Sequence, residues 1–150
     1  MNLFFGFLLL FISTIVGYYL SLKFVKKRAF YENFSSFNKT FTSEVGFSQK
    51  TLKDIISKFD NDFYNFLKNN INGSKDFSLK YLSEEEITFA KTYANSIGVG
   101  DKHSQLEFLK SITTEIDNRL KVSIENEKKY KNLYVKLGFL IGLICLIIFL

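Results

Sequence analysis

The chain has 150 residues, of which 47% are hydrophobic, no proline and a formal net charge of +5. A chain of this length normally builds one domain around one core. Eight of the 20 basic residues flank two uncharged segments near the ends of the chain, and the other 12 are outnumbered by 15 acidic residues. This distribution argues against a basic nucleic-acid-binding face, so we expect no nucleic-acid partner.

The first 22 residues carry no charged side chain. From Leu3 to Leu22 there are 20 mostly apolar residues. As a helix they would span about 30 Å, the thickness of bilayer hydrocarbon. A cleaved signal peptide fits less well, because no basic segment precedes the apolar run and no A-x-A-like cleavage site follows it. We therefore predict a transmembrane helix over residues 1–22.

A stripe of aromatic side chains follows this apolar segment. Its members recur mostly three and four residues apart, a spacing that predicts a helix reaching Glu44 or Val45 and stopped by Gly46. A stripe of this kind indicates helix packing in preference to a ligand site. The stripe consists of Phe24, Phe30, Phe34, Phe37 and Phe41.

The middle of the chain predicts shorter helices. Ser48 is a candidate cap for a helix from about Gln49 to Asn69, which could divide at residues 60–62. The stretch "NNINGSKD" around Gly73 predicts a loop, and a short helical turn is expected over residues 77–82.

Ser83, with a glutamate three residues later, forms a capping-box pattern. The acidic residues 84–86 also suit the positive end of a helix dipole. A metal-binding acidic cluster is the alternative, but no histidine or further carboxylate lies nearby in the sequence. We predict a helix that runs to Ile97, with Gly98 just past its end.

The stretch "SIGVGDKHSQ", residues 96–105, contains the single histidine of the chain, His103. It lacks the spacing of a phosphate loop and the ligand number of a zinc site. A Gly-x-Gly-Asp protease would need its aspartate in the membrane and a second aspartate beside it. We therefore expect no catalytic, metal or cofactor site and no enzyme.

The same stretch fits a tight corner between two helices. Gly98 would end one helix, and Asp101 would cap the next near Ser104 and Gln105. Two interpretations stay open for these four residues: a turn with no further role, or a docking element for a partner protein.

From residue 102 onward nothing breaks the helical pattern. The uncharged final segment predicts a second transmembrane helix. This helix would cover residues 133–150, because the long side chain of Lys136 can reach the membrane interface. A buried amphipathic tail is the alternative, and it fits less well because no polar face interrupts the run. An apolar stripe precedes this segment and consists of Leu106, Leu109, Ile112, Ile116, Leu120 and Ile124.

Basic residues lie on the inner sides of both spans, and such an excess marks the cytoplasmic side of a membrane. We therefore predict an all-α protein: a small cytoplasmic helical bundle, residues 23–132, between an N-terminal and a C-terminal transmembrane helix, with both termini outside. The lone Cys145 lies in the second span. The flanking basic residues are Lys23, Lys26, Lys27, Arg28, Lys128, Lys129, Lys131 and Lys136.

Each predicted span contains a pair of small residues four apart, Ser13 with Gly17 and Gly138 with Gly142. Pairs of this kind allow close helix contact in membranes. The two spans could pack together within one chain, or copies of the chain could associate into a homo-oligomer, and the sequence leaves both open.

The spacing of Gly98, Asp101, Ser104 and Gln105, opening a charged helix that enters a glycine-bearing span, resembles the stage III sporulation protein AB family. The stretch "TSEVGFSQKTL", residues 42–52, is similar to that family as well. Residues 60–83 depart from it, being shorter and lacking its usual prolines and tryptophan.

The resemblance implies a membrane protein of endospore formers, similar to the inner-membrane platform protein F of type II secretion and type IV pilus systems. It implies a place in the channel complex between mother cell and forespore, in the outer forespore membrane. The implied partners are a cytoplasmic ring ATPase, the AA protein, and the other membrane components of the same operon, with membrane lipids around the spans.

We expect a non-enzymatic component that docks this ATPase to the membrane assembly. A small self-associating membrane protein of holin or stress type, with a regulatory cytoplasmic domain, is the alternative from another class. A membrane-anchored enzyme is a third.

Overall fold

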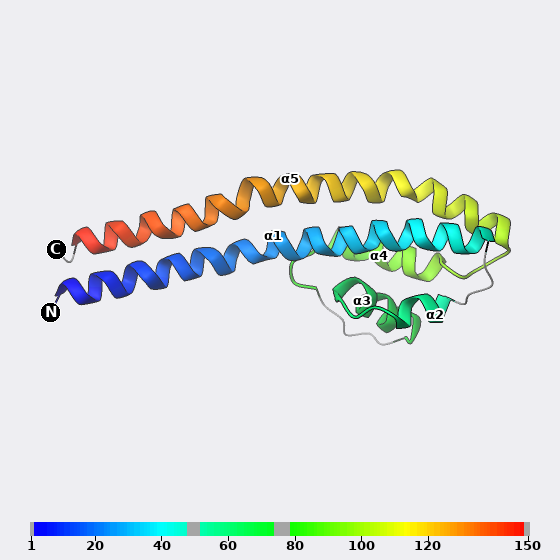
Figure 1. The fold of residues 1–150 in the computed structure, drawn as a ribbon, viewed down its shortest axis with the longest axis horizontal. Coiled ribbons are helices and arrows are strands. Elements are labelled where there is room, and N and C mark those ends of the chain that lie inside the picture. The colour runs from blue at the N-terminus through cyan, green and yellow to red at the C-terminus, as the bar shows by residue number, and fades with distance from the viewer. Residues whose placement is uncertain (1, 48–51, 74–78, 149–150) are drawn as a thin grey trace. The chain divides into compact units, whose positions relative to one another are not determined.

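The computed structural model describes residues 2–47, 52–73 and 79–148, and every regular element in these ranges is an α-helix. The predicted all-α fold is therefore confirmed. The helices are α1 (Asn2–Phe47), α2 (Leu52–Ser57), α3 (Asp62–Ile71), α4 (Glu84–Ser96) and α5 (Lys102–Ile148), shown in Figure 1.

The chain divides into two compact units, and both long helices contribute to each. The terminal unit comprises Met1–Arg28 and Val122–Leu150, and the central unit comprises Ala29–Lys121. The predicted membrane spans, 1–22 and 133–150, lie inside the terminal unit. The predicted limits of the two spans and of the domain 23–132 mark where the chain would enter a bilayer. They stay predictions.

The first helix ends later than predicted, and the second helix divides near residues 60–62, where the sequence allows a division. The first helix continues through Gly46 to Phe47, because one glycine costs a helix only about 1 kcal/mol. The predicted second helix is divided, with α2 ending at Ser57 and α3 beginning after Asn61, whose side chain accepts a hydrogen bond from the Tyr64 N–H at 3.2 Å. The expected cap at Ser48 lies outside the described residues.

Residues 79–82, the described part of the short helical turn expected over 77–82, form a turn. It is closed by a hydrogen bond of 2.9 Å from the Leu82 N–H to the Leu79 carbonyl.

Four of the five members of the aromatic stripe of α1 lie in the core of the central unit, as the spacing predicts. Phe30, Phe34, Phe37 and Phe41 are all buried. The Phe34 ring lies 4.8 Å from that of Phe63 in α3 and 4.6 Å from that of Tyr93 in α4, measured between centroids. Such pairs add about 0.5–1.5 kcal/mol each beyond the burial of their area. The stripe therefore holds α3 and α4 against α1.

One polar side chain sits inside this aromatic core. Asn38 donates hydrogen bonds to the Leu109 carbonyl at 3.3 Å and to the Thr113 hydroxyl at 2.9 Å, and it accepts one from the Tyr93 hydroxyl at 3.0 Å. Burial raises the pKa of Tyr93, so its hydroxyl stays protonated as the donor. These bonds join α1, α4 and α5 at one level and fix their register.

The predicted capping box at the start of α4 is confirmed. The Ser83 hydroxyl accepts from the Glu86 N–H at 3.3 Å, and the Glu86 carboxylate accepts from the Ser83 N–H at 2.9 Å. The same carboxylate also accepts from the buried Tyr31 hydroxyl of α1 at 3.2 Å. Its neighbour Glu85 instead pairs with Arg119 of α5 at 3.0 Å. Both glutamates therefore have partners that explain their positions without a metal.

Candidate functional site

The corner between α4 and α5 is built by backbone geometry that the sequence predicts. Ile97 is the C-cap of α4, and Gly98 follows with φ of 76°. Gly100 has φ of 91°. A side chain is strained in this left-handed region, which glycine enters freely. The two glycines thus let the chain reverse direction within a few residues.

Asp101 caps the start of α5. Its carboxylate accepts hydrogen bonds from the N–H groups of His103 at 2.8 Å and Ser104 at 3.0 Å, and from the Ser104 hydroxyl at 2.8 Å. These donors, led by the Ser104 N–H, lower the pKa of Asp101 because they favour its ionised form. The carboxylate therefore satisfies helix-end donors that would otherwise face water.

Gln105 has a role that sequence reasoning missed. Its side chain is only 6% exposed. The amide nitrogen donates to the carbonyls of Ser96 at 2.8 Å and Val99 at 2.7 Å, and the amide oxygen accepts from the Gly98 N–H at 2.8 Å. The last carbonyls of a helix need partners, and a glutamine across the turn is one way to supply them. The need of these carbonyls for partners was the one feature from which sequence reasoning could have predicted this role of Gln105.

His103 lies on the outside of the corner. Its side chain is 82% exposed, and Nε2 lies 3.3 Å from Oε1 of Glu107, one helical turn further on. Among the described residues, no group of three or more His, Cys, Asp or Glu side chains is placed to hold a metal ion. An exposed pair of this type has a small energetic effect.

The tip of the corner presents an apolar side chain to the outside. Val99, between the two glycines, is 64% exposed, and the neighbouring residues Asp101 to Ser104 are exposed as well. The inner side of the corner is therefore held by the hydrogen bonds of Gln105, and its outer side is accessible to solvent.

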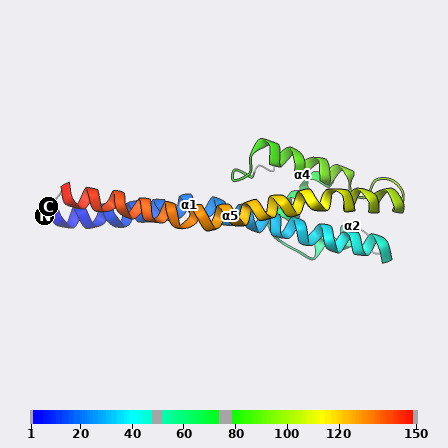
Figure 2. The same ribbon diagram turned by 90° about the horizontal axis from the view of Figure 1, so that it is seen from above.

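In the terminal unit, the two small-residue pairs face each other. A Cβ atom placed on Gly17 would lie 2.5 Å from the Tyr134 carbonyl oxygen and 3.2 Å from the Gly138 Cα. One placed on Gly138 would lie 2.6 Å from the Ser13 carbonyl oxygen. One placed on Gly142 would collide with the Ser13 hydroxyl. The glycines thus bring the backbones of α1 and α5 together within one chain, and Figures 1 and 2 show these ends side by side.

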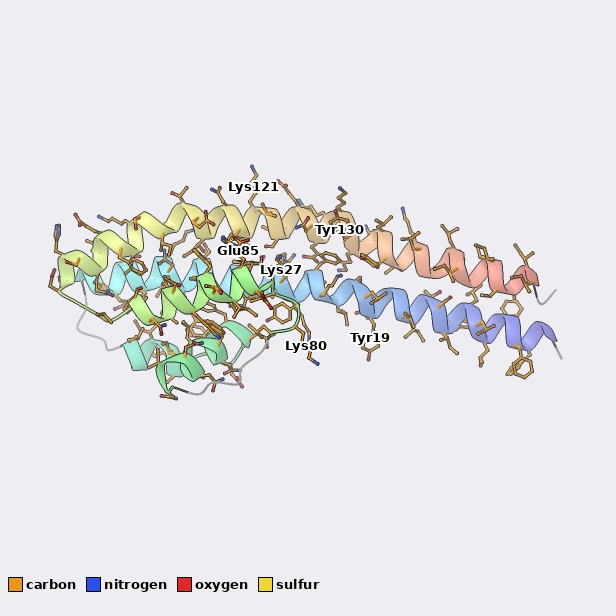
Figure 3. The ribbon with its side chains drawn as sticks, turned by 180° about the vertical axis from the view of Figure 1, so that it is seen from behind. Tyr19, Lys27, Lys80, Glu85, Lys121 and Tyr130 are labelled. Carbon is orange, nitrogen blue, oxygen red and sulfur yellow. The ribbon has the colours of Figure 1, made fainter. Side chains whose placement is uncertain are left out.

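The outward faces of the same helix segments are apolar. Both α1 and α5 are long and apolar enough to cross a membrane. Figure 3 shows Tyr19 pointing away from α5, and it is exposed. A row this apolar is unfavourable in water and suits lipid, which fits a membrane protein. The exposed side chains of this row include Phe4, Phe7, Phe11, Ile15, Leu140, Ile144 and Ile147.

A comparison with known protein families finds a match over most of the chain. The sequence model of stage III sporulation protein AB matches residues 57–150, more than half of the chain. The chain belongs to the stage III sporulation protein AB family. No curated protein and no solved structure matches it.

The match to stage III sporulation protein AB covers α3, α4, the corner and all of α5, including its apolar end. It also covers residues 60–83, where the sequence predicts a departure from the family pattern. The N-terminal stretch at residues 42–52 and helix α1 lie outside it. Membership in this family indicates a role in sporulation.

Proposed function

We propose that the chain is a non-enzymatic membrane component of the sporulation channel complex, where it docks a cytoplasmic ring ATPase to the membrane assembly. The family match over residues 57–150 carries this proposal. In the proposed orientation the central unit lies in the cytoplasm, because basic residues lie on the inner sides of both apolar segments. The mother-cell side is what the family resemblance implies.

The corner between α4 and α5 is the proposed contact for the ATPase. Its shape is fixed by three hydrogen bonds of Gln105, so a partner would meet a surface that needs little ordering. Val99 offers an exposed apolar anchor at the tip, with Asp101 and His103 beside it as polar neighbours. Protein interfaces commonly combine such an anchor with a polar rim.

The alternative of a self-associating holin- or stress-type protein has weaker support. It would use the small-residue faces of the spans to contact other copies. Those faces are occupied by each other, since Gly17 lies against Gly138 within one chain. The other apolar surface of the spans suits lipid as well as a second copy.

A co-purification experiment tests the proposal. The tagged full-length chain would be extracted in detergent from membranes of sporulating cells, and the ring ATPase would be sought among the recovered proteins. The variant Val99→Asn removes the apolar anchor. Val122→Asn is the matched control, because Val122 is an exposed valine of α5 outside the corner, at 52% against 64% for Val99.

We expect the ATPase with the unchanged chain and with Val122→Asn, and much less of it with Val99→Asn. Absence of the ATPase from the unchanged chain's complex would refute the docking function. Equal recovery with both variants would instead move the contact away from the corner.

A further inference from the structure

A basic hollow lies between α1 and α5 in the terminal unit, and neither the family match nor the proposed function assigns it a role. Its volume is about 240 Å³. Three of its six lining side chains are cationic at neutral pH, and one is a carboxylate. The lining residues are Arg28, Ile124, Glu127, Lys128, Lys131 and Asn132.

The charges in the hollow do not cancel. The Glu127 side chain is 11% exposed, with Oε2 3.1 Å from Nε of Arg28 and Oε1 3.7 Å from Nζ of Lys131. The lining thus contains three basic side chains and one carboxylate, a surplus of two formal positive charges. Asn132 adds an amide donor. This chemistry suits an anion with several acceptor oxygens, such as a phosphate.

The position of the hollow along the helices selects the kind of phosphate. Arg28 follows Leu22, the end of the first apolar segment, by about 9 Å of helix, and Lys131 precedes Leu133 by about 3 Å. The headgroup layer extends about 5–8 Å beyond the hydrocarbon, and long basic side chains can reach into it. With the terminal helices in a bilayer, the hollow therefore lies at the depth of lipid phosphates.

Aromatic rings beside the hollow fit the same depth. The Phe24 ring stacks on that of Tyr130 at 5.1 Å and lies 5.7 Å from that of Tyr134, between centroids. Nζ of Lys23 lies 5.0 Å from the Phe24 ring centroid. Aromatic and basic side chains gather in this way where hydrocarbon meets water.

We propose that this hollow binds the phosphate of an anionic phospholipid headgroup. Arg28, Lys128 and Lys131 would contact the phosphate oxygens, and the acyl chains would lie along the apolar outer face of the helices. The proposal depends on membrane insertion of the terminal unit and not on the identity of any protein partner. It gives the basic flanks a specific ligand in addition to their effect on orientation.

Native mass spectrometry of the full-length chain in detergent tests the proposal. The chain would be titrated with phosphatidylglycerol, with phosphatidylcholine and with inorganic phosphate. The double variant Lys128→Gln/Lys131→Gln removes two cations from the hollow. The control Lys121→Gln/Lys129→Gln has the same net charge and changes two exposed lysines of α5 that do not line it; Figure 3 shows Lys121 pointing away from α1.

The expected result is preferential binding of phosphatidylglycerol that weakens at least about tenfold in the first double variant and little in the control. Glu127→Gln, which removes the one carboxylate of the lining, should tighten binding. Equal losses in both double variants would overturn the site, because they would indicate general charge attraction. Inorganic phosphate binding as tightly as the lipid would overturn its assignment to a headgroup.

Discussion

At the residue scale, Gln105 has the largest predicted effect on the corner. Gln105→Met keeps the length of the side chain but leaves two carbonyls and one N–H without their partner. Loss of partners at a buried position should lower the free energy of unfolding by about 2–3 kcal/mol. Thermal unfolding of the full-length chain in detergent, followed by circular dichroism, measures this.

Lys110→Met is the control for Gln105→Met, because it places the same side chain at an exposed position of α5. It should leave the melting temperature nearly unchanged. Similar melting temperatures for the two variants would contradict the proposal that the hydrogen bonds of Gln105 stabilise the corner.

Asp101 makes the stability of the corner dependent on pH. Its folded pKa is lowered because Ser104 and His103 donate hydrogen bonds to the ionised form. The stabilisation is therefore fully present above the ordinary pKa of aspartate, about 3.9, and is lost as the pH falls through the lowered value. The stability advantage of the unchanged chain over Asp101→Asn should shrink as the pH falls below about 3.9. An advantage independent of pH would contradict this role.

At the element scale, the contact between α1 and α5 in the terminal unit depends on Gly138. Gly138→Ile would drive a side chain into the Ser13 carbonyl and the Gly17 backbone. Overpacking of this kind should cost about 1–3 kcal/mol or more, measured as a lower midpoint of denaturation in mixed micelles. Leu140→Ile, at an exposed position two residues further on, is the control and should have little effect. An unchanged midpoint for Gly138→Ile would mean that the helices do not pack this closely.

The polar centre of the aromatic core couples three helices. Tyr93→Phe removes the donor to Asn38, and Asn38→Leu removes the other partner together with the bonds to α5. Each change should destabilise the chain by about 1–3 kcal/mol, and the double variant by less than the sum. A double-mutant cycle from denaturant unfolding measures this coupling. Additive effects would show that the two side chains act independently.

These elements differ in how far sequence could predict them. The stripe of Phe30, Phe34 and Phe37 is periodic, and the cap at Ser83 is local, so both could be read from neighbouring residues. Asn38 could not be placed in the core, because its partner Tyr93 lies 55 residues away in the sequence. The position of Gln105 in the first turn of α5 could be predicted. Its hydrogen bonds could not, because they depend on the path of the chain through the corner.

At the scale of the whole molecule, two surfaces have different proposed roles: one contacts lipid and the other contacts a partner protein. The apolar outer face of the terminal unit suits lipid, and the corner of the central unit offers Val99 and exposed polar groups to a protein. Membership in the stage III sporulation protein AB family indicates a role in sporulation for the chain, but it assigns no role to either surface. The proposed docking role would act through binding alone.

The most direct test is the affinity of the purified ring ATPase for the full-length chain reconstituted in lipid nanodiscs. The account predicts saturable binding that is preserved in Val122→Asn and weakened at least about tenfold in Val99→Asn, as loss of a central apolar anchor typically produces. No saturable binding of the ATPase to the unchanged chain would contradict it.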